Sequence, residues 1–495
     1  MYTVHLRVND RSTDKPTPVR LRITDGHGMY HAPLGRLTRF ATAPGTEVGG
    51  NVLVGGRAWA YLDGAGEAQL PAGPLTVEIF KGPEYNPVRR QVQLAEGQIS
   101  LRFEIDRWID LRPDGWFAGD LRAHALSPQA AALEGAAEGL AQVHLLARAR
   151  QENSSSPGAY ENLLEFSGTE PAITRAGCSV VVNTLNVHPQ LGTVGLLDSH
   201  RPVYPMMFGG EGQPDDWSVA DWCDQCHRKR GLVTWPDLGR CAEPVPQGEA
   251  LAALLLGKVD AYEIASLPDI DAESLNLFYR LLDVGMHIAL VGASGKESNA
   301  TVLGAMRTYA RLNHGTPCNS ADWIASVRRR HTFITNGPLL RFEAAGEGPG
   351  GNLSLEQGGK IHLSVDVQST HPFDQVEILA GGSVLASKTA SGNRQATRLE
   401  LDFQPERSTW LVARCYGADA VESGSKVFAH SSPIWVEVAG KPFLPDAESV
   451  EVLLGHLNRT HTWISTQAHC SQERHRNNLV AVIDEAATRL RLGVG

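Results

Sequence analysis

The sequence predicts an α/β protein in which a parallel sheet or barrel lies between two antiparallel β-sandwiches, with a helical tail at the C-terminus. Three observations predict this fold class. Short alternating strands fill the first part of the chain, buried strands alternate with helices in the middle, and alternating strands return before a final helical stretch. We place the four regions at residues 1–105, 106–340, 341–440 and 441–495.

The first region alternates strand patterns with turn signals. The run Val19–Thr24 alternates its faces and stops at Asp25-Gly26, a turn dipeptide. The runs Leu75–Phe80 and Ile99–Ile105 repeat this plan. Such spacing is typical of a small antiparallel sandwich.

The middle region alternates buried strands with amphipathic helices. The expected strands are Cys178–Val182, Gly231–Trp235, Val259–Ile264 and His287–Val291. The expected helices are Ser218–Arg228 and Ser274–Leu282, each with one apolar stripe. Repeated strand, helix and strand predict a parallel sheet or barrel, in which ligands bind at the carboxyl ends of the strands.

The third region returns to the strand pattern at Ile361–Val367, Leu399–Phe403 and Pro433–Val438, which predicts a second sandwich. The tail is expected to be helical, with Asp446 as the N-cap of its first helix.

Composition narrows the possible functions. The 495 residues suggest about three domains. Hydrophobic residues at 42% and charged residues at 20% are those of an ordinary globular protein. A net charge of −10 disfavours nucleic acid as a partner, and the longest apolar run, Ala250–Leu256, is too short to span a membrane. A small-molecule substrate or ligand is therefore the expected partner, and the sequence does not indicate an oligomeric state.

The N-terminus, Met1–Arg7, has a strand pattern and lacks the basic and apolar segments of a signal peptide. Seven scattered cysteines do not form a disulfide framework. These features predict a cytoplasmic protein, although an exported chain trimmed of its leader would have the same features.

The string Gly115-Trp116-Phe117-Ala118-Gly119-Asp120-Leu121-Arg122-Ala123-His124 follows the first sandwich. It resembles the opening G-W-[YF]-x-G-D-L-H-x-H of the CehA/McbA-type metallohydrolases of the PHP (polymerase and histidinol phosphatase) superfamily. Further strings resemble the same family in chain order: Lys81–Tyr85, Gly257–Ile264, Phe278–Gly285, Arg307–Tyr309 and Thr332–Pro338.

The resemblance implies a PHP-like distorted (β/α) barrel whose strand ends hold His, Asp and Glu around two or three divalent metals, such as Zn, Mn or Fe. Two side chains at i and i+2 of a strand point the same way, so H-x-H delivers two imidazoles to one ion. Such metals lower the pKa of a bound water and stabilise the leaving oxygen. The implied substrates are phosphoesters, esters or carbamates.

This sequence departs from the family pattern at the metal ligands. Arg122 replaces the first histidine of H-x-H, and Thr193 stands where relatives often have a histidine. Trp235-Pro236-Asp237 replaces His-Pro, and Ser294-Gly295-Lys296-Glu297 replaces S-D-x-H. Arg and Lys do not coordinate divalent cations at neutral pH. The loss of three ligands is expected to weaken a multi-metal site by at least about a thousandfold.

Five residues remain as candidate metal ligands. His124 either lines a functional pocket or is a structural histidine, and Glu263 at a strand end needs a cation or hydrogen-bond donors. Asp237 either supplies an oxygen ligand or caps a turn. Asp120 is expected to orient the neighbouring histidine, and His188 before Pro189 favours a loop position.

The two introduced cations suggest another use for the pocket. Arg122 and Lys296 together could hold a carboxylate, phosphate or sulfate without metal. The alternative is that each forms an ion pair with a nearby acid such as Asp120 or Glu263.

The segment Cys223-Asp224-Gln225-Cys226-His227 has the C-x-x-C-H form of a c-type haem attachment site. Both cysteines lie on the apolar stripe of a predicted helix beside Trp222, which favours core cysteines. A zinc site with Cys241 would have an unusual spacing.

Two functions therefore stand as hypotheses. The chain is either a PHP-type metal-dependent hydrolase with an altered metal site, or an inactive relative that binds an anionic or carbohydrate-like ligand or a protein.

Overall fold

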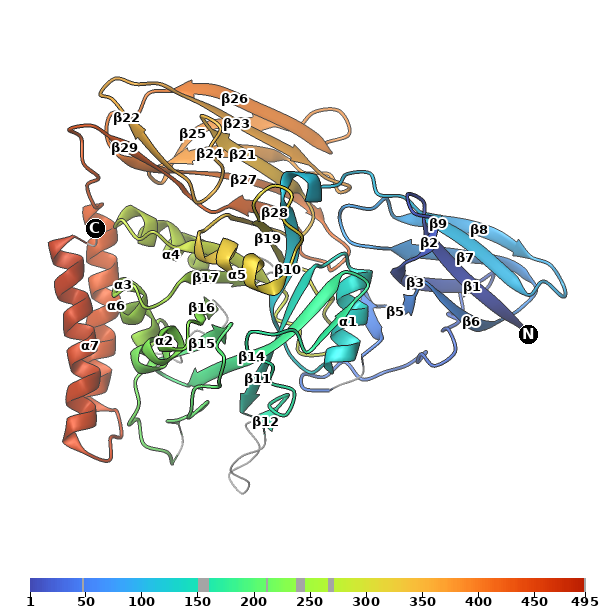
Figure 1. The fold of residues 1–495 in the computed structure, drawn as a ribbon, viewed down its shortest axis with the longest axis horizontal. Helices are drawn as coiled ribbons and strands as arrows, with labels where there is room; N and C mark the ends of the chain where they lie inside the picture. Colours follow the sequence, from blue (N-terminus) through green and yellow to red (C-terminus); the bar gives the residue numbers. More distant parts are fainter. Residues whose placement is uncertain (47–48, 150–159, 211, 237–244, 266–270, 494–495) are drawn as a thin grey trace.

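The structure is a computed structural model that describes residues 1–46, 49–149, 160–210, 212–236, 245–265 and 271–493 (Figure 1). It confirms a mixed α/β chain built from several sheet-rich units. No helix of the described residues combines the length and the apolar character that a membrane crossing requires.

The first region folds as two sheets around one apolar cluster, on the right of Figure 1. One sheet contains β1 (Tyr2–Asp10), β2 (Lys15–Pro16), β6 (Ala65–Leu70) and β9 (Ser100–Ile105). The other contains β3 (Pro18–Asp25), β4 (Asn51–Val54), β5 (Arg57–Asp63), β7 (Gly73–Phe80) and β8 (Val88–Leu94). A strand at the N-terminus is confirmed as β1, whose alternation places Val4, Leu6 and Val8 in the core between the sheets.

The central sheet carries the residues that the sequence singled out. Its hydrogen-bonded order begins with β18 (Ala289–Ala293), β17 (Ala261–Ala265), β16 (Leu232–Pro236), β15 (Gly192–Leu197), β14 (Cys178–His188), β11 (Gln142–Ala149) and β10 (Trp116–Ala123). It continues through β19 (Arg307–Arg311), β20 (Thr332–Thr335) and β28 (Lys426–Ser431). Two short strands, β12 (Tyr160–Glu161) and β13 (Ile173–Arg175), pair with β11 and β14. A strand lies at each of the four predicted places, but β15 is antiparallel to both of its neighbours, so the sheet is mixed rather than parallel.

The strands of the described residues do not close into the distorted (β/α) barrel that the resemblance implies. The sheet curves so that β18 approaches β10, β19 and β20. No backbone ladder joins β18 to these strands in the described residues, and side-chain hydroxyls of β19 and β20 bond the β18 backbone instead. The Thr308 hydroxyl bonds both the N–H and the carbonyl of Gly292, at 2.7 and 2.9 Å, and Thr332 Oγ1 donates to the Leu290 carbonyl at 2.8 Å. Beyond β18, one parallel bridge joins Lys296 to Ala123 of β10. These contacts satisfy polar groups that a strand ladder would otherwise pair.

Helices cover the outer side of the central sheet. They are α1 (Pro128–Ala137), α2 (Val219–Arg228), α3 (Gly248–Leu255), α4 (Ala272–Asp283) and α5 (Ser320–Arg328), while the short 3-10 turn η1 (Arg112–Asp114) leads into β10. The tail forms a hairpin of α6 (Ala447–Thr466) and α7 (Glu473–Leu492), which packs against α3 (Figure 1). The predicted N-cap is confirmed, since the Asp446 carboxylate accepts from the Ser449 N–H at 2.8 Å.

The last β-rich region packs a three-stranded sheet against an extension of the central sheet. The small sheet contains β21 (Leu339–Ala344), β23 (Ile361–Gln368) and β26 (Ala396–Phe403). The extension contains β22 (Asn352–Leu355), β24 (Gln375–Ala380), β25 (Ser383–Thr389), β27 (Thr409–Ala420) and β29 (Ile434–Val438), together with β28. The ladder between β20 and β28 crosses the boundary that we placed at residue 340, so the two regions share one continuous sheet.

Candidate functional site

A cavity of about 490 Å³ opens at the carboxyl ends of β10 and β16. It is lined by Thr42, Pro44, Arg122, Leu185, Val187, Thr193, Pro236, Gly295, Glu297, Ser298, Ala300 and Thr301. Hydroxyl and aliphatic groups therefore form most of the wall. We call this hollow the strand-end cavity.

Arg122 is ion-paired at this cavity. Its Nε donates to Glu263 Oε1 at 2.6 Å, and the side chains of Arg122 and Glu263 are 6% and 0% exposed. Burial raises the pKa of Glu263, and the neighbouring guanidinium opposes that shift. Of the two roles that the sequence allowed for Arg122, the structure shows the ion pair with Glu263.

Lys296 is held in a separate buried pair. Its Nζ lies 3.4 Å from Glu134 Oε2 of α1 and donates to the Thr301 carbonyl at 2.6 Å. The second Glu134 oxygen accepts from the Gly50 N–H at 2.9 Å. Lys296 therefore pairs with an acid that the sequence analysis did not name, and it does not line the strand-end cavity beside Arg122.

Asp120 is a fully buried carboxylate that binds backbone. Its Oδ1 accepts from the N–H groups of Arg122 and Ser294, at 3.2 and 3.1 Å, and its Oδ2 accepts from the Gly304 N–H at 2.8 Å. These bonds fix the loop after β18 against β10. Both oxygens of Asp120 are occupied by this role, and no bond joins the carboxylate to His124.

His124 directly follows β10 and is completely buried. Its Nδ1 lies 2.9 Å from the Leu146 carbonyl, so Nδ1 carries the proton and donates. Its Nε2 has no hydrogen-bond partner in the described part of the chain. Burial, with Arg148 and Arg122 nearby, lowers the pKa of His124 well below its usual value. The imidazole is therefore neutral, with one unused lone pair.

His188 lies at the end of β14, and both of its ring nitrogens are used. Nε2 lies 2.9 Å from Asp215 Oδ1, while Nδ1 accepts from the N–H groups of Gln190 and Leu191 at 3.1 and 2.9 Å. The histidine thus closes the turn between β14 and β15 and ties it to Asp215. It has no lone pair left for a metal.

The remaining candidate ligand, Asp237, lies outside the described residues. Among the residues that are described, no three His, Cys, Asp or Glu side chains form a group that could hold a metal ion. Arg122 occupies one expected ligand position. The carboxylate oxygens of Asp120 and the ring nitrogens of His188 are already hydrogen-bonded to other groups of the protein. The described side chains do not fit a site for two or three metals.

A loop of the first sandwich completes the strand-end cavity. Thr42 and Pro44 line it, the Gly45 N–H donates to the Glu297 carbonyl at 2.8 Å, and Asn299 Nδ2 donates to the Ala41 carbonyl at 3.4 Å. Sequence reasoning missed this contribution, because the loop lies some 250 residues from its partners. No local pattern indicates such a contact.

The acid at the cavity rim is also paired. Arg148 Nη1 donates to Glu297 Oε1 at 2.7 Å, and Arg148 Nε donates to Glu161 Oε2 at 3.2 Å. One cation therefore faces two carboxylates at this rim. Each charged side chain named at the cavity and its rim thus has an oppositely charged partner within the protein.

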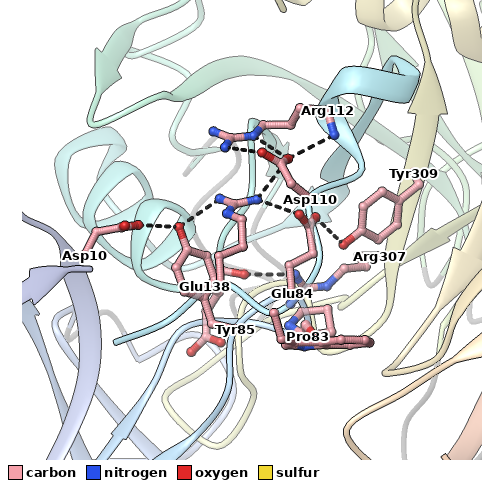
Figure 2. Close-up of polar contacts among 11 residues, drawn as sticks. Asp10, Pro83, Glu84, Tyr85, Asp110, Arg112, Glu138, Arg307 and Tyr309 are labelled. Carbon is pink, nitrogen blue, oxygen red and sulfur yellow. Dashed lines mark hydrogen bonds and ion pairs between the residues drawn. The ribbon is translucent and has the colours of Figure 1, made fainter. Parts of the chain in front are cut away.

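A second polar cluster lies where the first sandwich meets β19 (Figure 2). Tyr309 donates to Glu84 Oε1 at 2.9 Å, and Arg107 pairs with Glu84 Oε2 at 2.5 Å. Arg107 also donates to the Tyr85 hydroxyl at 2.8 Å, which donates in turn to Asp10 at 2.9 Å. The hollow beside this cluster measures only about 10 Å³, which is about the space of one water molecule, and the network joins the first sandwich to the central sheet.

The C-x-x-C-H segment lies on α2. Cys223 and Cys226 are both fully buried in an apolar cluster with Trp222, and burial raises the pKa of both thiols. His227 pairs with Asp260 at 2.9 Å. These are the positions expected of core cysteines, while Cys241 lies outside the described residues.

Comparisons with known proteins found little. No family model matches the chain, and no curated protein matches it. Among solved structures, it is similar to the crystal structure of a beta-glucuronidase from Parabacteroides merdae, with 9% sequence identity and a TM-score of 0.18. The match covers 86% of this chain and 61% of the beta-glucuronidase chain. A TM-score this low does not indicate a shared fold.

Proposed function

We propose that this chain is an inactive relative of the CehA/McbA-type PHP hydrolases whose former metal pocket binds a small, uncharged, hydroxyl-bearing molecule without metal. One observation carries the proposal. Four of the positions at which the sequence departs from the family pattern line a single cavity, namely Arg122, Thr193, Gly295 and Glu297, whereas Trp235 packs in an apolar cluster outside its wall. Their convergence supports the resemblance, and their chemistry argues against a multi-metal centre.

The ion pairs around the strand-end cavity favour a neutral ligand over an anion. Arg122 pairs with Glu263, Lys296 with Glu134, and Arg148 with two acids. An anion would have to compete with these carboxylates for their cations. The hydroxyls of Thr42, Thr193, Ser298 and Thr301 suit the hydroxyl groups of a carbohydrate-like molecule.

Calorimetric titration with matched neutral and anionic compounds tests this proposal. The neutral set is glucose, N-acetylglucosamine and myo-inositol, and the anionic set is glucose 6-phosphate, gluconate and inorganic phosphate. We expect saturable binding of a neutral member. Binding confined to the anions, or binding that requires added zinc or manganese, would contradict the proposal.

A pair of variants locates the binding site. Thr193→Phe places a ring in the strand-end cavity at a strand position, where aromatic residues are tolerated, and should abolish binding. Thr389→Phe makes the same change on the exposed strand β25 and should leave binding unaltered. Equal behaviour of the two variants would place the ligand elsewhere.

A metal-dependent hydrolase acting on a phosphoester, ester or carbamate is the second candidate function. It is favoured by the buried lone pair of His124 Nε2 and by Glu263 Oε2, neither of which has a hydrogen-bond partner among the described residues. Both atoms are of ligand type for Zn, Mn or Fe. Stoichiometric metal in the purified protein, lost in His124→Ala, would favour this candidate.

A further inference from the structure

A second cavity, of about 430 Å³, lies where the two β-rich regions approach each other. It is lined by Asn86, Pro87, Trp108, Gln368, Ser369, Thr370, Gln395 and Ala396. These residues come from the β7–β8 loop, from the connector after β9, and from the paired ends of β23 and β26. Its size falls in the range of about 300–1,000 Å³ that small-molecule sites occupy. We call it the inter-sandwich cavity.

The wall of this cavity is uncharged. It combines one indole, three side-chain amides and two hydroxyl groups, with neither a lysine, an arginine nor an acid among its lining residues. An aromatic ring offers an apolar face for the C–H groups of a sugar, while amides supply a donor and an acceptor for neighbouring hydroxyls. Anions and cations find no counter-charge here. This set of groups fits a neutral saccharide.

Hydrogen bonds within the protein hold the lining side chains in place. Trp108 Nε1 donates to the Pro83 carbonyl at 2.9 Å, which orients the indole. Gln395 Nε2 donates to the Thr370 backbone carbonyl at 2.9 Å. The Gln395 backbone carbonyl accepts from the Ser369 N–H at 2.8 Å. A wall that is already ordered loses little conformational entropy when a ligand binds.

Several polar groups of the wall still have capacity to bond. Gln368 Nε2 donates to Asp366 at 3.0 Å, but Gln368 Oε1 has no partner among the described residues. The Asn86 side chain is exposed and likewise makes no hydrogen bond within that part of the chain. The Ser369 hydroxyl oxygen accepts from the His371 N–H at 2.9 Å, which leaves its proton available to donate. The wall therefore offers a ligand the Gln368 side-chain carbonyl, the whole Asn86 amide and the Ser369 hydroxyl proton.

We propose that the inter-sandwich cavity binds a neutral saccharide, with its C–H face on Trp108 and its hydroxyls on Asn86, Gln368 and Ser369. This proposal does not rest on the proposed function, because the two cavities share no residue. It also gives the last β-rich region a role, since this region supplies five of the eight lining residues.

The test begins with an array of neutral oligosaccharides probed with the full chain. Solution titrations of maltose, cellobiose, lactose and N,N′-diacetylchitobiose then follow tryptophan fluorescence. We expect at least one neutral saccharide to bind saturably. The double variant Asn86→Ala/Gln368→Ala should bind it about tenfold more weakly, because it removes two neutral hydrogen bonds.

Controls separate this site from the strand-end cavity and from loss of folding. Trp108→Ala should abolish binding, whereas Trp108→Phe keeps a ring and should retain part of it. Gln93→Ala removes an exposed amide of β8 outside the cavity and should have no effect, as should Thr193→Phe in the strand-end cavity. The proposal is overturned if no neutral saccharide binds, or if the Asn86→Ala/Gln368→Ala protein binds as tightly as the parent.

Discussion

Arg122 and Glu263 form a buried ion pair, with Nε and Oε1 2.6 Å apart, that joins β10 to β17 beside the strand-end cavity. The guanidinium stands where the sequence pattern led us to expect a metal-binding imidazole. It neutralises a carboxylate that, without a partner, would be costly to bury. Arg122 thus provides within the protein the positive charge that a bound cation could otherwise supply to Glu263.

Removal of one partner should be far more damaging than replacement of both. Arg122→Met leaves Glu263 buried without its cation, and we expect the free energy of unfolding to fall by about 3–5 kcal/mol. Arg122→Met/Glu263→Leu should recover most of that loss, because no charge stays buried. Denaturant unfolding of the parent, the single and the double variants measures this. Equal destabilisation of the single and double variants would contradict the claim that Arg122 compensates the buried charge of Glu263.

Gly295 and Arg122 should be coupled. A Cβ atom at Gly295 would lie 3.1 Å from Arg122 Nη2, and the φ angle of Gly295 is +59°. Gly295→Asp alone should therefore destabilise the fold, by about 1–2 kcal/mol from the backbone conformation alone. Adding Arg122→His removes this crowding but also removes the cation beside Glu263, so denaturant unfolding should show the double variant destabilised by less than the sum of the two single variants.

The same double variant restores two of the expected ligand types. Arg122→His/Gly295→Asp should contain more bound zinc or manganese than the parent protein after equal exposure, measured by plasma mass spectrometry. Unchanged metal content would count against our placement of the former metal site.

Acid should destabilise the protein through buried neutral histidines. His430 Nδ1 donates to the Ser431 carbonyl and its Nε2 accepts from the Tyr279 hydroxyl, which itself accepts from Arg414. Burial lowers the pKa of His430 to about 3, and Arg414 adds to that shift. A depressed folded-state pKa gives stability that is present above about 6.5 and is lost as the pH falls toward 3. Burial lowers the pKa of His144 to about 4, so His144 acts in the same direction.

Unfolding free energies measured between pH 7 and 4 check this. His430→Gln keeps an acceptor for Tyr279 and cannot titrate, so its stability should depend less on pH than that of the parent. His5→Gln, at an exposed position of β1, serves as the control. A parent protein whose unfolding free energy is constant across this range would refute the claim that buried neutral histidines make the fold sensitive to acid.

Cys223 and Cys226 should be packing residues. The protein as purified should show no Soret band, and Cys223→Ala/Cys226→Ala should leave its visible spectrum unchanged. The same variant should be less stable by about 1 kcal/mol or more for each thiol removed from the apolar cluster. A Soret band in the parent that is absent from the variant would show haem attachment.

Sequence patterns predicted the elements better than their assembly. The buried runs at 178–182, 231–235, 259–264 and 287–291 coincide with strands, because side-chain periodicity is a local property. The turn that reverses β15 was missed, since it is closed by the ring of His188. The gap beside β18 was also missed, because it is bridged by hydroxyls from distant segments.

The candidate site was predictable in part. The family resemblance implied which positions would meet at the strand ends, and Arg122, Thr193 and Gly295 do line one cavity. It did not indicate that Lys296 would pair with Glu134, or that Thr42 would form the opposite wall. Both depend on packing between segments far apart in the chain.

Plasma mass spectrometry of the purified, tag-free protein, before and after exposure to zinc, manganese and iron, tests the central claim most directly. We expect substoichiometric metal in both samples and an unchanged melting temperature, because the described side chains at the strand ends do not form a multi-metal site. One or more tightly bound equivalents of metal, lost in His124→Ala, would contradict it.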